Sequence, residues 1–173
     1  MKEDGAWNYE VSSDLNTARY WAAKGFVVMN NSLVIAGGAS EYYLDTIEVV
    51  GPNTESRTLP ISLPNPQYGS CIVPWDDDTF MLIEGKAFIT SIDFAYATGK
   101  TYFINMANNI ITNGPKMLKG RYNFACHTLN INGDDYIIVA GGESSAKSTE
   151  ILSKANYESG WIESKNGQQC IWH

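Results

Sequence analysis

Three copies of one motif run along this chain, and they constrain its fold more than any other feature. Each copy starts with a polar residue and a tyrosine, passes through two apolar stretches separated by a polar turn, and ends at a glycine. The tyrosine–glycine pairs are Tyr20 and Gly38, Tyr68 and Gly85, and Tyr122 and Gly142. A period of about 50 residues predicts a propeller or a solenoid. Such architectures present binding surfaces, so the pattern favours a binding module over an enzyme.

The apolar stretches predict β-strands, and further strands follow each glycine. The turns at 30–32, 76–78 and 132–135 are rich in Asn, Asp and Gly, which accept the positive φ of tight hairpins. Strands without polar alternation, such as 33–36, predict sheets that are covered on both faces. Gly38 and Gly142 are expected where φ is positive or where backbones crowd.

A third and a fourth strand complete each copy. The third strands are predicted at 46–50, 101–105 and 149–153, and the fourth near Arg57, Ile111 and Trp161. The middle copy is longer between its glycine and its fourth strand than the other two copies are. This difference predicts an insertion within residues 86–100.

These features resemble the kelch repeat over residues 7 to about 164. They are four strands per copy, a double glycine after the second strand, Trp161 in the fourth strand, and Gly114-Pro115-Lys116-Met117 before the next arginine. Glu84 departs from the pattern by replacing the first glycine of the middle copy, and Arg57 and Ile111 stand where the family often has tryptophan. The resemblance implies an all-β fold: a β-propeller of kelch type, with about three four-stranded blades plus one orphan strand.

The resemblance also divides the chain. It assigns 1–17 to the fourth strand of a preceding blade, around Trp7, and its link; 18–64, 65–118 and 119–164 to three blades; and 165–173 to a tail. Propellers close with about four to eight blades, so three blades leave apolar ends uncovered. We therefore expect flanking blades in a longer protein, or a homodimer that closes the ring.

Composition narrows the range of functions. The net charge of −7 argues against sequence-independent nucleic-acid binding, which needs clustered Lys and Arg. The apolar runs are far shorter than the ~20 residues of a membrane span, and the start lacks the apolar core of a secretory signal. The three cysteines, Cys71, Cys126 and Cys170, lack metal-ligand spacing, and their odd number predicts free thiols in the cytoplasm.

Catalytic, metal and cofactor signatures are not evident. Cys126 and His127 are neighbours on a predicted strand and therefore point to opposite faces, so they are not expected to act as a nucleophile and its base. The acidic turn at 76–78 lacks the spacing of a calcium loop. We expect no cofactor and no enzymatic activity.

The candidate binding residues share one end of the predicted blades. Antiparallel alternation places the loops between second and third strands on the same face as the links between blades, which makes that face tyrosine-rich and comparatively basic. Tyr and Arg are enriched at binding hot spots. The candidates are Arg19, Tyr20, Tyr42, Tyr43, Tyr68, Arg121, Tyr122, Ser144 and Ser145. The alternative is that the arginines are structural and the tyrosines pack between blades.

The kelch resemblance implies a function as a protein or peptide receptor, for example the substrate receptor of a ubiquitin ligase. Two alternatives stay open. One is an enzyme on the same fold, galactose-oxidase-like or sialic-acid-modifying, although copper chemistry would need a His/Tyr cluster and the chain has only His127 and His173. The other is an actin-associated structural protein.

Overall fold

The described part of the chain is built from β-strands. The computed structural model describes residues 14–25, 27–29, 32–51, 55–145 and 147–164. They form four small antiparallel sheets and two short 3-10 helices, η1 (Thr90–Ile92) and η2 (Tyr157–Ser159), with no α-helix among them. None of these helices is long and apolar enough to cross a membrane. The all-β prediction is confirmed, whereas Trp7, most of the turn at 30–32 and the predicted tail lie outside the described residues.

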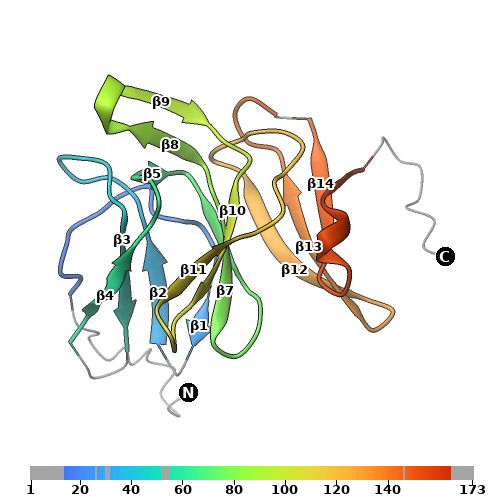
Figure 1. Cartoon of the computed structure of the whole chain (residues 1–173), viewed down its shortest axis with the longest axis horizontal. Coiled ribbons are helices and arrows are strands. Elements are labelled where there is room, and N and C mark those ends of the chain that lie inside the picture. The colour runs from blue at the N-terminus through green and yellow to red at the C-terminus, as the bar shows by residue number, and fades with distance from the viewer. Residues whose placement is uncertain (1–13, 26, 30–31, 52–54, 146, 165–173) are drawn as a thin grey trace, which may run out of the picture.

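Three of the sheets are four-stranded meanders, one in each sequence copy, and they stand side by side in Figure 1. The first contains β1 (Val28–Met29), β2 (Ser32–Ala36), β3 (Thr46–Val50) and β4 (Arg57–Ser62). The second contains β6 (Cys71–Pro74), β7 (Thr79–Ile83), β10 (Thr101–Asn105) and β11 (Ile110–Asn113). The third contains β12 (Ala125–Ile131), β13 (Asp134–Ala140), β14 (Thr149–Ser153) and β15 (Ile162–Glu163). The third strand of each meander has the predicted bounds.

The fourth sheet is made by the insertion in the middle copy. A hairpin of β8 (Lys86–Ile89) and β9 (Phe94–Ala97) interrupts the second meander between β7 and β10, and η1 forms its tip. The short strand β5 (Gln67–Tyr68), which belongs to the link before the meander, pairs with β8. In Figure 1 this sheet lies above the others, at the end where the links enter. The insertion is therefore where the sequence placed it.

The middle sheet separates two apolar cores. All five residues of β7 are buried. Phe80 and Leu82 pack with residues of the first meander, such as Val34. Met81 and Ile83 pack on the other face with residues of the third meander, such as Ile137. For β7 this alternation confirms that a continuous apolar strand is covered on both faces, because successive side chains of a strand point to opposite sides. Residues 33–36 differ from this, since Leu33 and Ile35 of β2 are only half-buried.

A disulfide joins the second and third meanders through their first strands. Cys71 in β6 and Cys126 in β12 are bonded, with their Cα atoms 6.2 Å apart. The prediction of free thiols is wrong for these two residues. The odd count was misleading because two of the three cysteines pair with each other; the third, Cys170, lies outside the described residues. Disulfides persist in oxidising compartments, so this bond fits poorly with the expected cytoplasmic location.

The glycines that end the second strands adopt backbone angles that other residues avoid. Gly38 has φ +101° and Gly142 has φ +88°, as predicted. A Cβ atom on Gly38 would lie 2.8 Å from the carbonyl oxygen of Tyr20, and one on Gly142 would lie 2.7 Å from that of Tyr122. Each glycine thus lets the strand end pass close to the link that carries the repeated tyrosine.

Replacing either glycine by valine should destabilise the protein. We expect Gly38→Val and Gly142→Val each to lower the free energy of unfolding by at least ~1–3 kcal/mol, because a β-branched residue is strained at positive φ and its Cβ would meet a backbone oxygen. Gly133, in the β12–β13 turn, has φ +96° with open space around it. Gly133→Asn is therefore the matched control and should cost much less in the same urea titration. Equal midpoints for wild type and both valine variants would contradict the assigned role.

Candidate functional site

An open groove lies at the end of the sheets where the links and the inserted hairpin meet. Its cavity volume is about 680 Å³. Three segments form it: the link before β1, the loop between β2 and β3, and the β8–β9 hairpin with Pro66 beside it. The lining residues are Tyr20, Trp21, Ala39, Ser40, Glu41, Tyr42, Tyr43, Pro66, Phe88, Thr90, Asp93 and Ala95.

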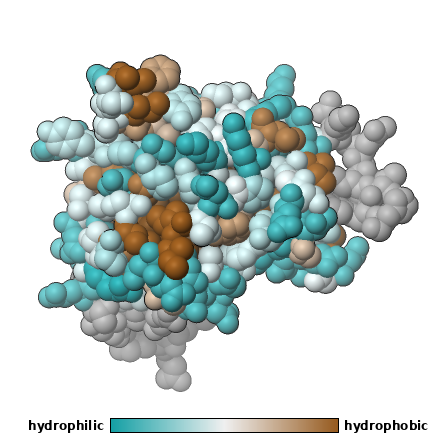
Figure 2. Space-filling model, viewed as in Figure 1, coloured by the Kyte–Doolittle hydropathy of each residue, from teal (hydrophilic) through white to brown (hydrophobic). Residues whose placement is uncertain are grey.

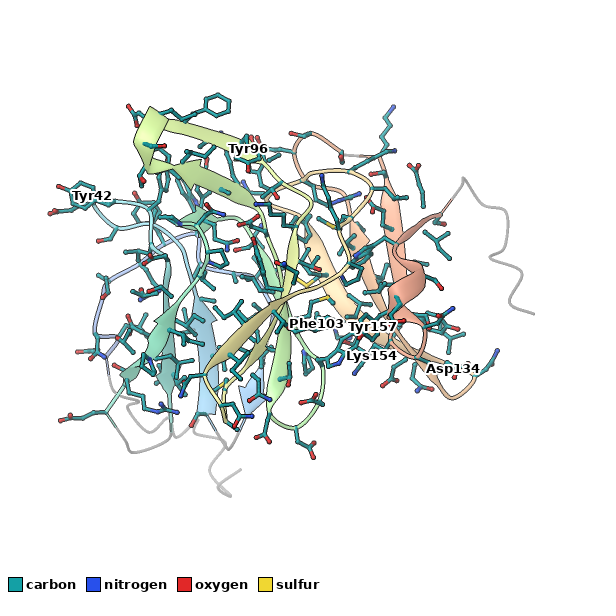
Figure 3. All side chains as sticks on the ribbon, viewed as in Figure 1. Tyr42, Tyr96, Phe103, Asp134, Lys154 and Tyr157 are labelled. Carbon is teal, nitrogen blue, oxygen red and sulfur yellow. A yellow bond between two sulfur atoms is a disulfide. The ribbon has the colours of Figure 1, made fainter. Side chains whose placement is uncertain are left out.

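Figure 3 shows which loops share this end of the molecule. Tyr42 projects from the β2–β3 loop at the upper left and Tyr96 lies on the hairpin at the top, whereas Asp134, the first residue of β13, lies at the lower right. The loops between second and third strands therefore share one end with the links, as strand alternation predicted. The acidic turns lie at the opposite end.

Aromatic rings form a continuous row along the groove. The centroid of Trp21 lies 4.8 Å from that of Tyr20 and 5.4 Å from that of Tyr68. Tyr68 stacks on Tyr43 at 5.1 Å, and Tyr43 contacts Phe88 of the hairpin at 4.9 Å. The row joins the link, the β2–β3 loop and the insertion into one surface. Its members are only partly covered, and Trp21 and Tyr20 are 58% and 52% exposed.

Trp21 is held in a backbone conformation that is unusual for a bulky residue. Its φ is +54°, in the left-handed region. The residues that follow the repeated tyrosine in the other copies are Gly69 and Asn123, with φ +63° and +56°. Gly and Asn are the residues that adopt this conformation most easily. Only the first copy places a large ring at this turn, and that ring lies exposed in the groove.

The two predicted arginines are not part of the exposed surface. The side chains of Arg19 and Arg121 are 1% and 0% exposed and form ion pairs with Glu48 and Glu150. Nη1 of Arg121 also donates to the carbonyl oxygens of Gly141 and Ser148, at 2.9 and 3.0 Å. Neither guanidinium can reach a partner at the groove. The described face is therefore tyrosine-rich, as predicted, but these arginines do not make it basic.

In the first and third copies, the glutamate of the ion pair also anchors the preceding link to the meander through hydrogen bonds. Glu48 accepts hydrogen bonds from the backbone N–H groups of Asn16 and Thr17, at 2.8 and 3.1 Å. Glu150 accepts the equivalent bonds from Leu118 and Lys119, at 2.7 and 3.2 Å. The sequence reasoning missed both glutamates. The signal was present, since Arg19 to Glu48 and Arg121 to Glu150 have the same spacing.

The middle copy replaces this arrangement. Gln67 stands at the arginine position, Tyr102 at the position of the paired glutamate, and Glu84 at that of the first glycine. Glu84 is buried and accepts hydrogen bonds from Thr98 Oγ1 at 2.9 Å and Asn65 Nδ2 at 3.3 Å. Burial raises the pKa of Glu84 despite these bonds, and burial likewise raises the pKa of Tyr102 to about 12.

Lys86 occupies the far end of the aromatic row. Its Nζ lies 5.9 Å from the ring centroid of Tyr68 and 5.1 Å from that of Tyr122. A hydrogen bond with Tyr68 raises the pKa of Lys86. The hydroxyl of Tyr122 donates to Glu143, which raises the pKa of Tyr122 and lowers that of Glu143. Tyr122 thus adjoins the row through Tyr68 but does not line the groove.

The remaining candidates divide between the groove and the third meander. Tyr20, Tyr42 and Tyr43 line the groove, and Tyr68 contacts the lining residues Trp21 and Tyr43 without lining it. Ser144 and Ser145 lie in the β13–β14 loop and do not line it; Ser145 Oγ donates to the carbonyl oxygen of Gly120 at 3.2 Å. Trp21 and the hairpin residues Phe88 and Asp93 were not predicted, although the longer middle copy pointed to the hairpin.

Among its described lining residues, the groove has acidic side chains but no basic one. Glu41 and Asp93 line it, and none of its described lining residues is Lys, Arg or His. Across the described residues, no group of three or more His, Cys, Asp and Glu side chains is arranged to hold a metal ion. Cys126 is bonded to Cys71 and His127 is exposed on β12, so the pair has no nucleophile–base geometry.

Comparison with protein-family models and with curated proteins finds no match to this chain. The resemblance to kelch repeats therefore rests on the sequence motifs alone.

Loss of a buried arginine should damage the fold far more than loss of an exposed lysine. Arg121→Ala leaves Glu150 buried without its cation and should cost about 3–5 kcal/mol of unfolding free energy. Lys119→Ala breaks the pair with Glu163, whose side chains are 44% and 36% exposed, and should cost less than about 1 kcal/mol. Urea denaturation of both variants measures the difference. Similar losses in the two would contradict the structural role of Arg121.

The buried carboxyl of Glu84 should give the protein a characteristic pH dependence. A carboxyl whose pKa is higher in the folded protein than in the unfolded chain binds more protons when folded, so acidification through that range favours folding. Glu84→Gln should therefore stabilise the protein at pH 7, with a gain that shrinks as the pH falls toward 4.5. Denaturation at both pH values measures the gain. Glu143→Gln is the control, because the lowered pKa of Glu143 predicts the opposite sign.

Proposed function

We propose that this chain is a binding module made of kelch-type propeller blades, and that the aromatic groove holds a peptide segment of a partner protein. The observation that carries the proposal is Trp21. A bulky residue at positive φ costs stability, and such strain is concentrated at functional sites. The strained residue places its ring in a groove that already contains Tyr20, Tyr43 and Phe88. Exposed Trp and Tyr clusters are typical of binding hot spots.

The blade assignment is supported by the repeated meanders and by the ion pairs that hold the links to them. Each meander is entered through a link, and in the first and third copies a buried Arg–Glu pair holds that link. The outer face of the third meander carries a row of paired residues, Ile138, Ile151 and Ile162, and Ile162 is 63% exposed. In a propeller, this row packs against a further blade of the same kind. The ubiquitin-ligase, enzymatic and actin-associated functions have no observation in their favour, and we do not propose them.

The disulfide supports a location for this module. Cys71 and Cys126 close a loop with a sequence separation of 55 and join two meanders. A bond of this kind is maintained where thiols are oxidised. We therefore place the binding function in an oxidising compartment rather than in the cytoplasm.

Selection from a library of random peptides displayed on phage tests the function. The immobilised 173-residue chain should enrich a defined set of peptides. Trp21→Asn should weaken their binding by about 1–2 kcal/mol, roughly 5- to 30-fold, because a hot-spot ring is removed. Its stability should change little, since relief of about 1–2 kcal/mol of backbone strain offsets lost ring contacts of about 0.5–1.5 kcal/mol each.

Asp76→Asn, at the opposite end of the sheets, is the control and should leave binding unchanged. Failure of the wild-type chain to enrich any peptide would overturn the proposed function. Peptides that bind the Trp21→Asn variant as tightly as the wild type would show that the groove is not the site.

A further inference from the structure

We infer that the groove selects a basic side chain, so that the peptide it binds carries Lys or Arg flanked by apolar residues. This inference rests on the proposed function and specifies the chemistry of the ligand. Three independent features of the described groove carry it: its charges, its ring surfaces, and the apolar tip of the inserted hairpin.

The charges of the groove are of one sign. Glu41 enters it from the β2–β3 loop and Asp93 from the β8–β9 hairpin, so a ligand in the groove lies between carboxylates that come from two elements. Both residues are exposed, and no described cation lines the groove to neutralise them. The whole chain carries a net charge of −7, which adds long-range attraction for a basic partner. An acidic peptide in the groove would be repelled by Glu41 and Asp93.

The ring surfaces provide the second element of a cation site. The faces of Trp and Tyr attract a cation placed within about 6 Å of the ring centroid. This protein already uses the same row in that way, because Lys86 lies over Tyr68 and Tyr122 at 5.9 and 5.1 Å. Tyr43, which stacks on Tyr68, lines the groove together with Trp21. A ligand cation in the groove would repeat, next to Glu41, the contact that Lys86 makes further along the row.

The hairpin tip provides apolar surface beside the acidic group. Ile92 and Phe94, which flank Asp93 in the sequence, are 64% and 55% exposed. Figure 2 shows apolar surface at this end of the molecule, at the upper left over the hairpin. Phe94 is stacked on Tyr96 at 6.3 Å, which orients it. Exposed apolar residues grouped around a groove are typical of an interaction site, so the basic residue of the ligand should have apolar neighbours.

The two carboxylates of the groove can be replaced by amides of the same shape. Glu41→Gln and Asp93→Asn are isosteric, and Asn suits the left-handed backbone of Asp93, whose φ is +50°. The double variant should therefore fold like the wild type. Asp77→Asn together with Asp78→Asn, in the β6–β7 turn at the opposite end, removes the same number of charges and is the matched control.

The same phage library, selected in parallel on the wild type and both double variants, tests the inference. Peptides enriched by the wild type and by the control should contain Lys or Arg at one position, and the groove variant should lose this enrichment. A synthetic copy of a selected peptide with norleucine at that position should bind the wild type about tenfold more weakly by calorimetry. On the groove variant, the two peptides should bind alike.

The outcomes separate the two proposals. Peptides that bind through Trp21 but show no enrichment of Lys or Arg would overturn the inference and leave the proposed function standing. Basic peptides that bind the groove variant as tightly as the wild type would also overturn it. A third outcome is that no peptide is enriched, while an amylose resin retains the wild-type chain but not the Trp21→Asn variant. That result would overturn both proposals and show that the aromatic rings bind a carbohydrate.

Discussion

The structure depends on the burial of one strand on both faces. β7 has no exposed residue, and its side chains alternate between two cores: Phe80 and Leu82 in one, Met81 and Ile83 in the other. Such a strand is stable only between two other sheets, so the repeats must stack face to face. Stacking then brings the links and the second-to-third-strand loops of neighbouring meanders to one end. The groove follows from this alignment, because its walls come from segments of two successive copies.

The sequence predicted the features that depend on local chemistry. The strand bounds, the insertion and the backbone of Gly38 and Gly142 followed from periodicity and turn residues, which act over a few positions. The disulfide between Cys71 and Cys126 did not follow, because it depends on how two meanders pack across 55 positions. Trp21 was missed although Gly69 and Asn123 follow the repeated tyrosine in the other copies. Its positive φ and the position of its ring in the groove depend on the three-dimensional structure.

The middle copy holds its link to the meander by a different interaction from that of the other two copies. It lacks the Arg–Glu pair and instead buries Gln67 and Glu84, whose carboxylate accepts hydrogen bonds from Thr98 and Asn65 in place of an arginine. Its link is held by β-pairing, since Gln67 lies opposite Ala87 of the inserted hairpin. The insertion that builds one wall of the groove therefore also replaces the lost ion pair. The same hairpin thus holds the link in place and forms one wall of the groove. This double role explains why the departure from the repeat pattern occurs in this copy.

Several departures from local folding preferences lie at the end of the molecule that carries the groove. Trp21 at positive φ, the exposed Ile92 and Phe94, and the buried Glu84 all belong to the end that carries the groove. In the β12–β13 turn at the opposite end, Asn132 and Gly133 occupy left-handed positions, as ordinary turn chemistry favours. Sequences that fold to one structure agree with local preferences except where function opposes them. The departures at the groove end are therefore an argument for function there, and this argument is independent of any resemblance to a known family.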